Sequence, residues 1–125
     1  MSYISTPSII IWGEEGTVTK NNTWFMRFGN GVSSTTEVRL PISSNCLMRN
    51  LRIRAVSGSG AAVVFTVRKN GADTAITATV AASGTTGSDL TNVVSLVAGD
   101  DISLKIVTGN SNTLIGDIVV SLEVG

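Results

Sequence analysis

The sequence predicts an all-β fold, an antiparallel β-sandwich of jelly-roll type with about eight or nine strands and a short N-terminal arm. Two observations support this prediction. Short segments alternate between apolar and polar residues, and clusters of Gly, Ser, Asn and Asp separate them. Alternation of this kind indicates strands with one buried and one solvated face, which is typical of antiparallel sheets.

The strongest local signal is a hairpin in the second half of the chain. Val63–Arg68 and Thr74–Val80 both alternate, and Asn70-Gly71 lies between them. A tight hairpin turn needs positive φ at its two central residues, and Asn and Gly tolerate it. The two segments are therefore predicted to pair.

Further strands are predicted on both sides of this hairpin. Thr23–Phe28 forms one, with Trp24, Met26 and Phe28 on one face, and Thr36–Ile42 forms another, in which Pro41 indicates an edge or a strand end. From residue 46 onward the alternation is strict. It predicts these inward-facing residues: Leu51, Ile53, Ala55, Val63, Phe65, Val67, Ile76, Ala78, Val80, Val94, Leu96, Ile102, Leu104, Ile106, Ile118, Val120, Leu122 and Val124.

Residues 1–20 differ from the jelly-roll domain expected over residues 21–125. Ser8–Trp12 is compact and apolar, and the turn-forming Gly13–Gly16 follows it. These residues are either an ordinary first strand or an arm that pairs with a neighbouring subunit.

Composition excludes several classes of function. The 125 residues carry nine basic and nine acidic side chains, so nothing favours nucleic-acid binding. A single cysteine and the absence of histidine exclude a disulfide framework, a Cys/His zinc site and a His-dependent nucleophile. Cys46 is expected to be a buried thiol. No secretion signal and no apolar run of membrane-spanning length is evident, so we expect cytoplasmic synthesis, no membrane partner, no cofactor and no enzymatic activity.

Acidic residues offer one alternative to this expectation. Asp100 and Asp101 could form an oxygen site for calcium together with Asp117. Ala98-Gly99-Asp100 also fits a plain turn in which the aspartate caps its own backbone. Because calcium takes six to eight oxygen ligands, the turn is favoured and no metal site is predicted.

Basic residues concentrate between positions 49 and 68. Arg52 and Arg54 share a strand face, and Arg68 is expected on a neighbouring strand. The group is either a solvated face or an interface, since arginine suits interface ion pairs. Together with the apolar N-terminal segment it gives the candidate subunit or capsid interface: Ile9, Ile10, Ile11, Trp12, Arg49, Arg52, Arg54 and Arg68.

Residues 50–124 resemble a jelly-roll module of phage structural proteins and of bacterial surface or spore filaments. The module is similar to the trimeric β-sandwiches of the tumour-necrosis-factor and complement type. The segments that carry the resemblance are Phe65–Thr74, Gly84–Asp89 and Val97–Lys105.

The resemblance implies a homotrimer that is part of a virion. It favours a capsid decoration (cement) protein that binds the outer surface formed by the phage major capsid protein and stabilises it, after synthesis in the host bacterial cytoplasm. The alternative is a tail-fibre or head-fibre module that binds a host receptor or carbohydrate through the loops at 57–60, 83–89 and 108–113.

Overall fold

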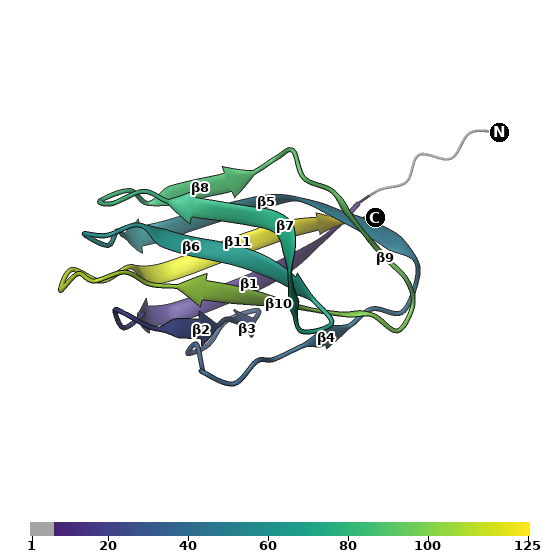
Figure 1. Cartoon of the computed structure of the whole chain (residues 1–125), viewed down its shortest axis with the longest axis horizontal. Coiled ribbons are helices and arrows are strands. Elements are labelled where there is room, and N and C mark those ends of the chain that lie inside the picture. The colour runs from purple at the N-terminus through teal and green to yellow at the C-terminus, as the bar shows by residue number, and fades with distance from the viewer. Residues whose placement is uncertain (1–6) are drawn as a thin grey trace.

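The computed structural model describes residues 7–125, which form two antiparallel sheets packed face to face (Figure 1). No helix occurs in the described part of the chain, and the predicted all-β class is confirmed. The strands are β1 (Ser8–Thr17), β2 (Thr23–Phe25), β3 (Arg27–Phe28), β4 (Leu40–Pro41), β5 (Cys46–Ser57), β6 (Val63–Lys69), β7 (Ala72–Val80), β8 (Thr86–Asp89), β9 (Val94–Leu96), β10 (Asp101–Val107) and β11 (Gly116–Val124).

The strand order is that of a jelly roll. Sheet A has the order β3-β1-β11-β5-β8, with β9 also paired to β5, and sheet B has the order β2-β10-β6-β7, with β4 also paired to β10. With the short strands β3, β4 and β9 set aside, the chain changes sheet at every connection except the β6–β7 hairpin. Four main strands in each sheet give the predicted architecture, and β3, β4 and β9 are short additions.

The core lies between the two sheets and follows the predicted alternation. Every residue predicted to face inward is buried, except that Val94 and Val124 are half-buried. Residues that the alternation did not single out complete the core, among them Trp12, Met48 and Ile115.

The predicted hairpin is confirmed. Asn70 and Gly71 join β6 to β7 with φ values of 52° and 79°, which are the two positive angles that a tight hairpin turn needs. The Asn70 side chain also donates to Asp100 Oδ1 at 2.9 Å and accepts from the Asp101 amide at 3.0 Å. The hairpin is thereby attached to the turn that precedes β10.

The segment that could have been an arm is a strand of the sandwich. β1 pairs with β11 from Ser8↔Val124 to Glu14↔Ile118, and with β3 at Trp12 and Gly13. The backbone of residues 8–14 is therefore hydrogen-bonded within its own chain. Residues 1–6 of the proposed arm lie outside the described residues.

Two predicted strands differ from the structure. Thr23–Phe28 is divided at Met26, because β2 belongs to sheet B whereas β3 belongs to sheet A. Of Thr36–Ile42, only Leu40 and Pro41 form a strand. The preceding residues lie against the outward side of sheet B, since Glu37 contacts Ser103 and Arg68 there.

Candidate docking face on sheet A

The outward face of sheet A brings together residues of β1, β11, β5 and β8. Alternation turns Arg52 and Arg54 away from the core, because Leu51, Ile53 and Ala55 are buried. The register then fixes their neighbours. One row across the sheet is Ile11, Ser121, Arg52 and Ser88, and the next contains Val119, Arg54 and Thr86.

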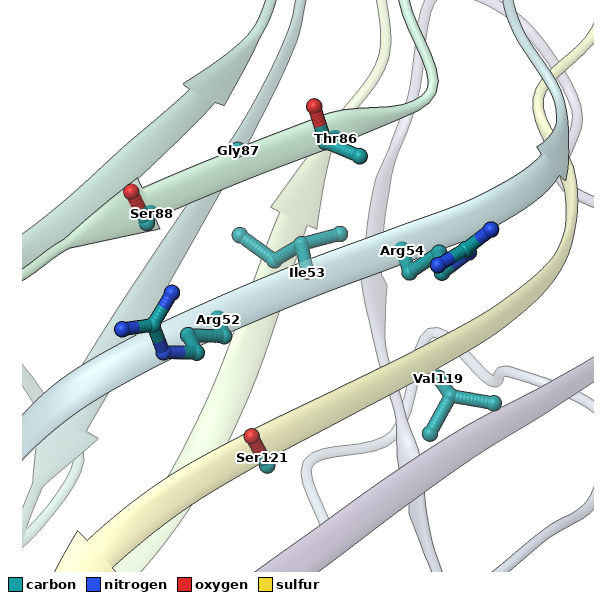
Figure 2. A pocket seen from close by; sticks show the side chains of 8 residues that line it. All are labelled: Arg52, Ile53, Arg54, Thr86, Gly87, Ser88, Val119 and Ser121. Atoms are coloured by element: carbon teal, nitrogen blue, oxygen red, sulfur yellow. The ribbon is translucent and has the colours of Figure 1, made fainter.

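A shallow trough runs along this face. Its main part has a volume of about 490 Å³, and Figure 2 shows Arg52 and Arg54 on β5 between the side chains of β8 and those of β11. A second part of about 350 Å³ also contacts Arg52 and Ser121, and a third of about 230 Å³ reaches Arg49 and Gly125. The trough is therefore lined by arginine, hydroxyl and aliphatic groups along much of β5.

Exposed aliphatic side chains gather on the same face. Among the described residues, six large hydrophobic side chains within strands are exposed, and five of them belong to sheet A: Ile9, Ile11, Leu47, Val56 and Val119. Ile9 is 65% exposed and Val119 is 57% exposed. Sheet B contributes only Val107. Among the strand residues, sheet A therefore presents the more apolar outward face of the two.

The arginines of this face have no acidic partner among residues 7–125. Arg49, Arg52 and Arg54 take part in none of the six ion pairs of that region. Glu123 lies opposite Arg49 in the register, but its Oε2 accepts from the Asn50 side chain. Asn50 has a φ of 53° at the point where the β5–β11 register shifts. This bulge separates Arg49 from the regular alternation of Arg52 and Arg54.

The outward side of sheet B has the opposite character. Five of the six ion pairs among residues 7–125 lie there, and they join Arg39, Arg68 and Lys105 to Glu37, Asp73 and Asp101. The sixth, Lys69–Asp100, lies at the end of the sandwich, where Lys69 Nζ also donates to the Ser95 carbonyl of β9. Burial raises the pKa of Glu37, but hydrogen bonds from Ser103 and Arg39 and the charges of Arg68 and Arg39 outweigh it and lower that pKa. The charges of this side are therefore balanced within the subunit.

The eight predicted interface residues do not share one surface. Ile9, Ile11, Arg52 and Arg54 lie together on the outward face of sheet A, and Arg49 lies at its end beyond the bulge. Ile10 is half-buried against the core, and Trp12 is completely buried and stacks on Phe28 with ring centroids 5.1 Å apart. Neither of these two can contact a partner without leaving the core.

Arg68 requires a correction. It was expected on a strand next to Arg52 and Arg54, but β6 belongs to sheet B and Arg68 points to the opposite side of the sandwich. The prediction was wrong because alternation identifies the face within one strand but does not assign the strand to a sheet.

Sequence reasoning also missed residues that extend the face. Val119 is an apolar residue on the outward face of β11, and it is exposed between the buried Ile118 and Val120. The signal was present in the sequence, since Ile118-Val119-Val120 is an apolar run in a strand that otherwise alternates. Such a run indicates a strand with apolar surroundings on both faces.

The aspartates considered for calcium are not brought together. Asp100 and Asp101 lie at the start of β10 and Asp117 lies at the start of β11, beyond the loop at the other end of β10, so about 20 Å of strand separates them. Asp100 accepts from Asn70 and from the Val97 amide, which is the capped turn that the sequence favoured. Asp117 accepts from the Gly16 amide at 3.0 Å.

Four loops meet at one end of the sandwich, on the left in Figure 1. They are 18–22, 57–62, 81–85 and 108–115, and they are joined by hydrogen bonds between Ser83 and Ser59, Gly60 and Thr113, and Asn21 and Gly109. Their side chains are mainly amides and hydroxyls, and none is aromatic. These loops can offer hydrogen bonds to a ligand, but they carry no aromatic ring of their own on which a sugar could stack.

Comparisons with known proteins identify no family for the chain. No family model and no curated protein matches it. Among solved structures, it is similar to a native family 35 carbohydrate binding module from Clostridium thermocellum, with 18% sequence identity and a TM-score of 0.43 over 96% of this chain and 98% of that one. In the described part of the chain, no helix has the length and hydropathy that a membrane span requires.

Proposed function

We propose that this protein is a phage virion structural protein, a capsid decoration (cement) protein that binds the outer capsid surface as a homotrimer and stabilises it. The observation that carries the proposal is the contrast between the two sheets. The outward face of sheet A holds exposed aliphatic residues beside arginines without acidic partners, whereas the charges of sheet B are paired within the subunit.

We assign the two halves of the sheet A face to two partners. The β1 half carries Ile9 and Ile11, with Val119 beside them, and suits a second copy of the chain, because permanent interfaces are the more apolar ones. The β5 half carries Arg52 and Arg54 and suits carboxylates of the major capsid protein. Arginine can bind such groups through two parallel hydrogen bonds.

The assignment to a phage virion is supported by the resemblance of residues 50–124 to phage jelly-roll modules. Three linked copies would add avidity to individually weak capsid contacts, so no deep pocket is required. The virion surface is then the proposed location, after synthesis in the host bacterial cytoplasm. The role requires no catalysis and no cofactor.

Co-sedimentation with capsids of the phage that encodes the chain tests the proposal. The wild type is expected to sediment with the capsids. The Arg52→Glu variant is expected to bind at least tenfold more weakly, because its new carboxylate would be repelled by the carboxylates of the capsid protein. Lys20→Glu is the matched control, because it makes the same charge change among the loops at the end of the sandwich. Equal binding of both variants would contradict the assigned face, and absence of the wild type from capsids and virions would contradict the function.

The second candidate is a tail-fibre or head-fibre module that binds a host receptor or carbohydrate. It is favoured by the convergence of the loops around 57–60, 83–89 and 108–113 at one end of the molecule. A glycan array with the isolated protein separates the two. Binding that is lost on Asn110→Ala or Asn112→Ala but retained by Arg52→Glu would support this candidate over capsid docking.

A further inference from the structure

A buried carboxylate lies at the open edge of the sandwich, away from the trough on sheet A. Glu14 follows Trp12 by two residues on β1, so its side chain points between the sheets, and the residue is only 3% exposed. Its neighbour Glu15 is exposed on the other side of the strand. A carboxylate in this inward position is costly unless it is compensated.

The protein compensates only part of this charge. Glu14 Oε2 accepts from the Ser33 amide at 2.6 Å and from the Ser33 hydroxyl. Within residues 7–125, no donor bonds Oε1, and Glu14 belongs to none of the ion pairs. Ser33 thus holds the carboxylate in place and leaves one oxygen free.

A cavity of about 100 Å³ adjoins this carboxylate. Glu14, Thr17, Thr19 and Ser33 supply its polar groups, and Trp24 and Val32 are among its other lining residues. Val32 is 68% exposed, so the lining reaches the protein surface. The Trp24 indole N–H already donates to the Thr19 carbonyl at 3.1 Å, which leaves the ring itself as the contact surface.

We propose that this cavity binds a primary ammonium group. An ammonium would supply the positive charge that the buried carboxylate lacks, in a charge-assisted hydrogen bond to Oε1. The Trp24 ring would add a cation–π contact, and the threonine hydroxyls can accept the remaining N–H groups. The volume equals about three waters at roughly 30 Å³ each, which suits an ammonium on a short alkyl stem.

A metal ion fits this cavity less well than an ammonium. Calcium requires six to eight oxygen ligands, and one carboxylate with a few hydroxyls does not provide them. Among the described residues, no group of three acidic, cysteine or histidine side chains could hold a metal. The ammonium can belong to a free amine or to a lysine side chain of a partner protein.

Titration with n-propylammonium chloride, followed by ¹H–¹⁵N NMR, tests the proposal. The Ser33 amide and the Trp24 indole signals are expected to shift in a saturable manner in the wild type and in Glu15→Gln. Glu14→Gln should bind at least tenfold more weakly, because it keeps an acceptor for Ser33 but loses the charge. Equal shifts with n-propanol, or unchanged affinity of Glu14→Gln, would overturn the proposal.

A second variant covers the case in which Glu14→Gln does not fold. Val32→Phe leaves the carboxylate intact and should obstruct the cavity from its exposed side, so it is expected to abolish the shifts. Unchanged binding by Val32→Phe would exclude this cavity as the site. Titration with Nα-acetyl-lysine N-methylamide distinguishes a partner's lysine from a free amine as the source of the ammonium group. If this compound binds at least as tightly as n-propylammonium, a partner's lysine is indicated. If only n-propylammonium binds, a free amine is indicated.

Discussion

The guanidinium group of Arg68 lies over the ring of Phe25, 5.5 Å from the ring centroid. The same side chain approaches Glu37 at 3.3 Å and Asp73 at 3.2 Å. Phe25 is only 9% exposed as a result, although it lies on the outward side of sheet B opposite Lys105. Arg68 therefore covers an aromatic ring and neutralises two carboxylates within one subunit.

Arg68→Ala is expected to destabilise the protein by about 2 kcal/mol, because it uncovers Phe25 and leaves Glu37 with only Arg39, the more exposed of its two cations. Urea unfolding measures the change. Arg52→Ala is the control, and it should stay within about 0.5 kcal/mol of the wild type since Arg52 is exposed and has no ion pair in the described region. Equal losses for the two variants would show that Arg68 has no special structural role.

Asp89 is expected to make the free energy of unfolding depend on pH in the acid range. Burial raises the pKa of Asp89, but hydrogen bonds from the Asn92 side chain and from the amides of Thr91, Asn92 and Thr77 outweigh it and lower the pKa from 3.8 to about 2. A lowered pKa in the folded state contributes stability above the unfolded pKa, and this contribution is lost as the pH falls toward 2. The contribution is about 2 kcal/mol.

Urea midpoints measured between pH 6 and pH 2 check this expectation. The wild type should lose stability over the acid part of the range, and Asp89→Asn should lose much of that slope while being less stable at pH 6. Asp117→Asn is the matched control, since it removes the same charge from an exposed position, and it should keep the wild-type slope. A wild-type slope in Asp89→Asn would refute the role given to this carboxylate.

Asn70 combines a strained backbone with two side-chain hydrogen bonds, and two substitutions separate these effects. Asn70→Gly keeps the positive φ and loses the bonds to the Asp100–Asp101 turn, at a cost of about 1–2 kcal/mol. Asn70→Ala also incurs the left-handed strain, so it should cost about 1 kcal/mol more. Thermal unfolding of the three proteins measures both differences, and equal stability of the two variants would exclude a strain contribution.

The proposed contact between subunits predicts that the oligomeric state depends on the exposed aliphatic side chains in the β1 half of the sheet A face. Light scattering at micromolar concentration should give a trimer for the wild type and a smaller species for the Ile11→Thr, Val119→Thr double variant, with little change in thermal stability because both side chains are exposed. Val107→Thr, at the exposed valine of sheet B, should remain a trimer. A monomeric wild type would contradict the proposed trimer.

The sequence was sufficient for features that depend on neighbouring residues. The Asn70-Gly71 turn and the inward sets of β5, β6, β10 and β11 follow from local backbone preference and from a period of two. Arg52 and Arg54 were placed on one outward face for the same reason.

Features that depend on distant pairing could not be predicted in this way. Met26 divides Thr23–Phe28 because its two halves find partners in different sheets, β10 for one and β1 for the other. Arg68 was assigned to the wrong side for an equivalent reason. Glu14 was missed because Gly13–Gly16 was predicted to be a turn, whereas β1 extends to Thr17. Its partner Ser33 is brought next to it only in the folded chain.

The pairing of β1 with β11 has a consequence for the order of events during synthesis. Among the strands of the sandwich, β1 is made first and its long partner β11 last, and Ser8 lies opposite Val124. The β6–β7 hairpin can close while translation continues, but sheet A cannot. Until β11 has been made, Ile10 and Trp12 of β1 lack the sheet partner that helps to bury them, so contact with the ribosome surface or a chaperone is to be expected during that interval.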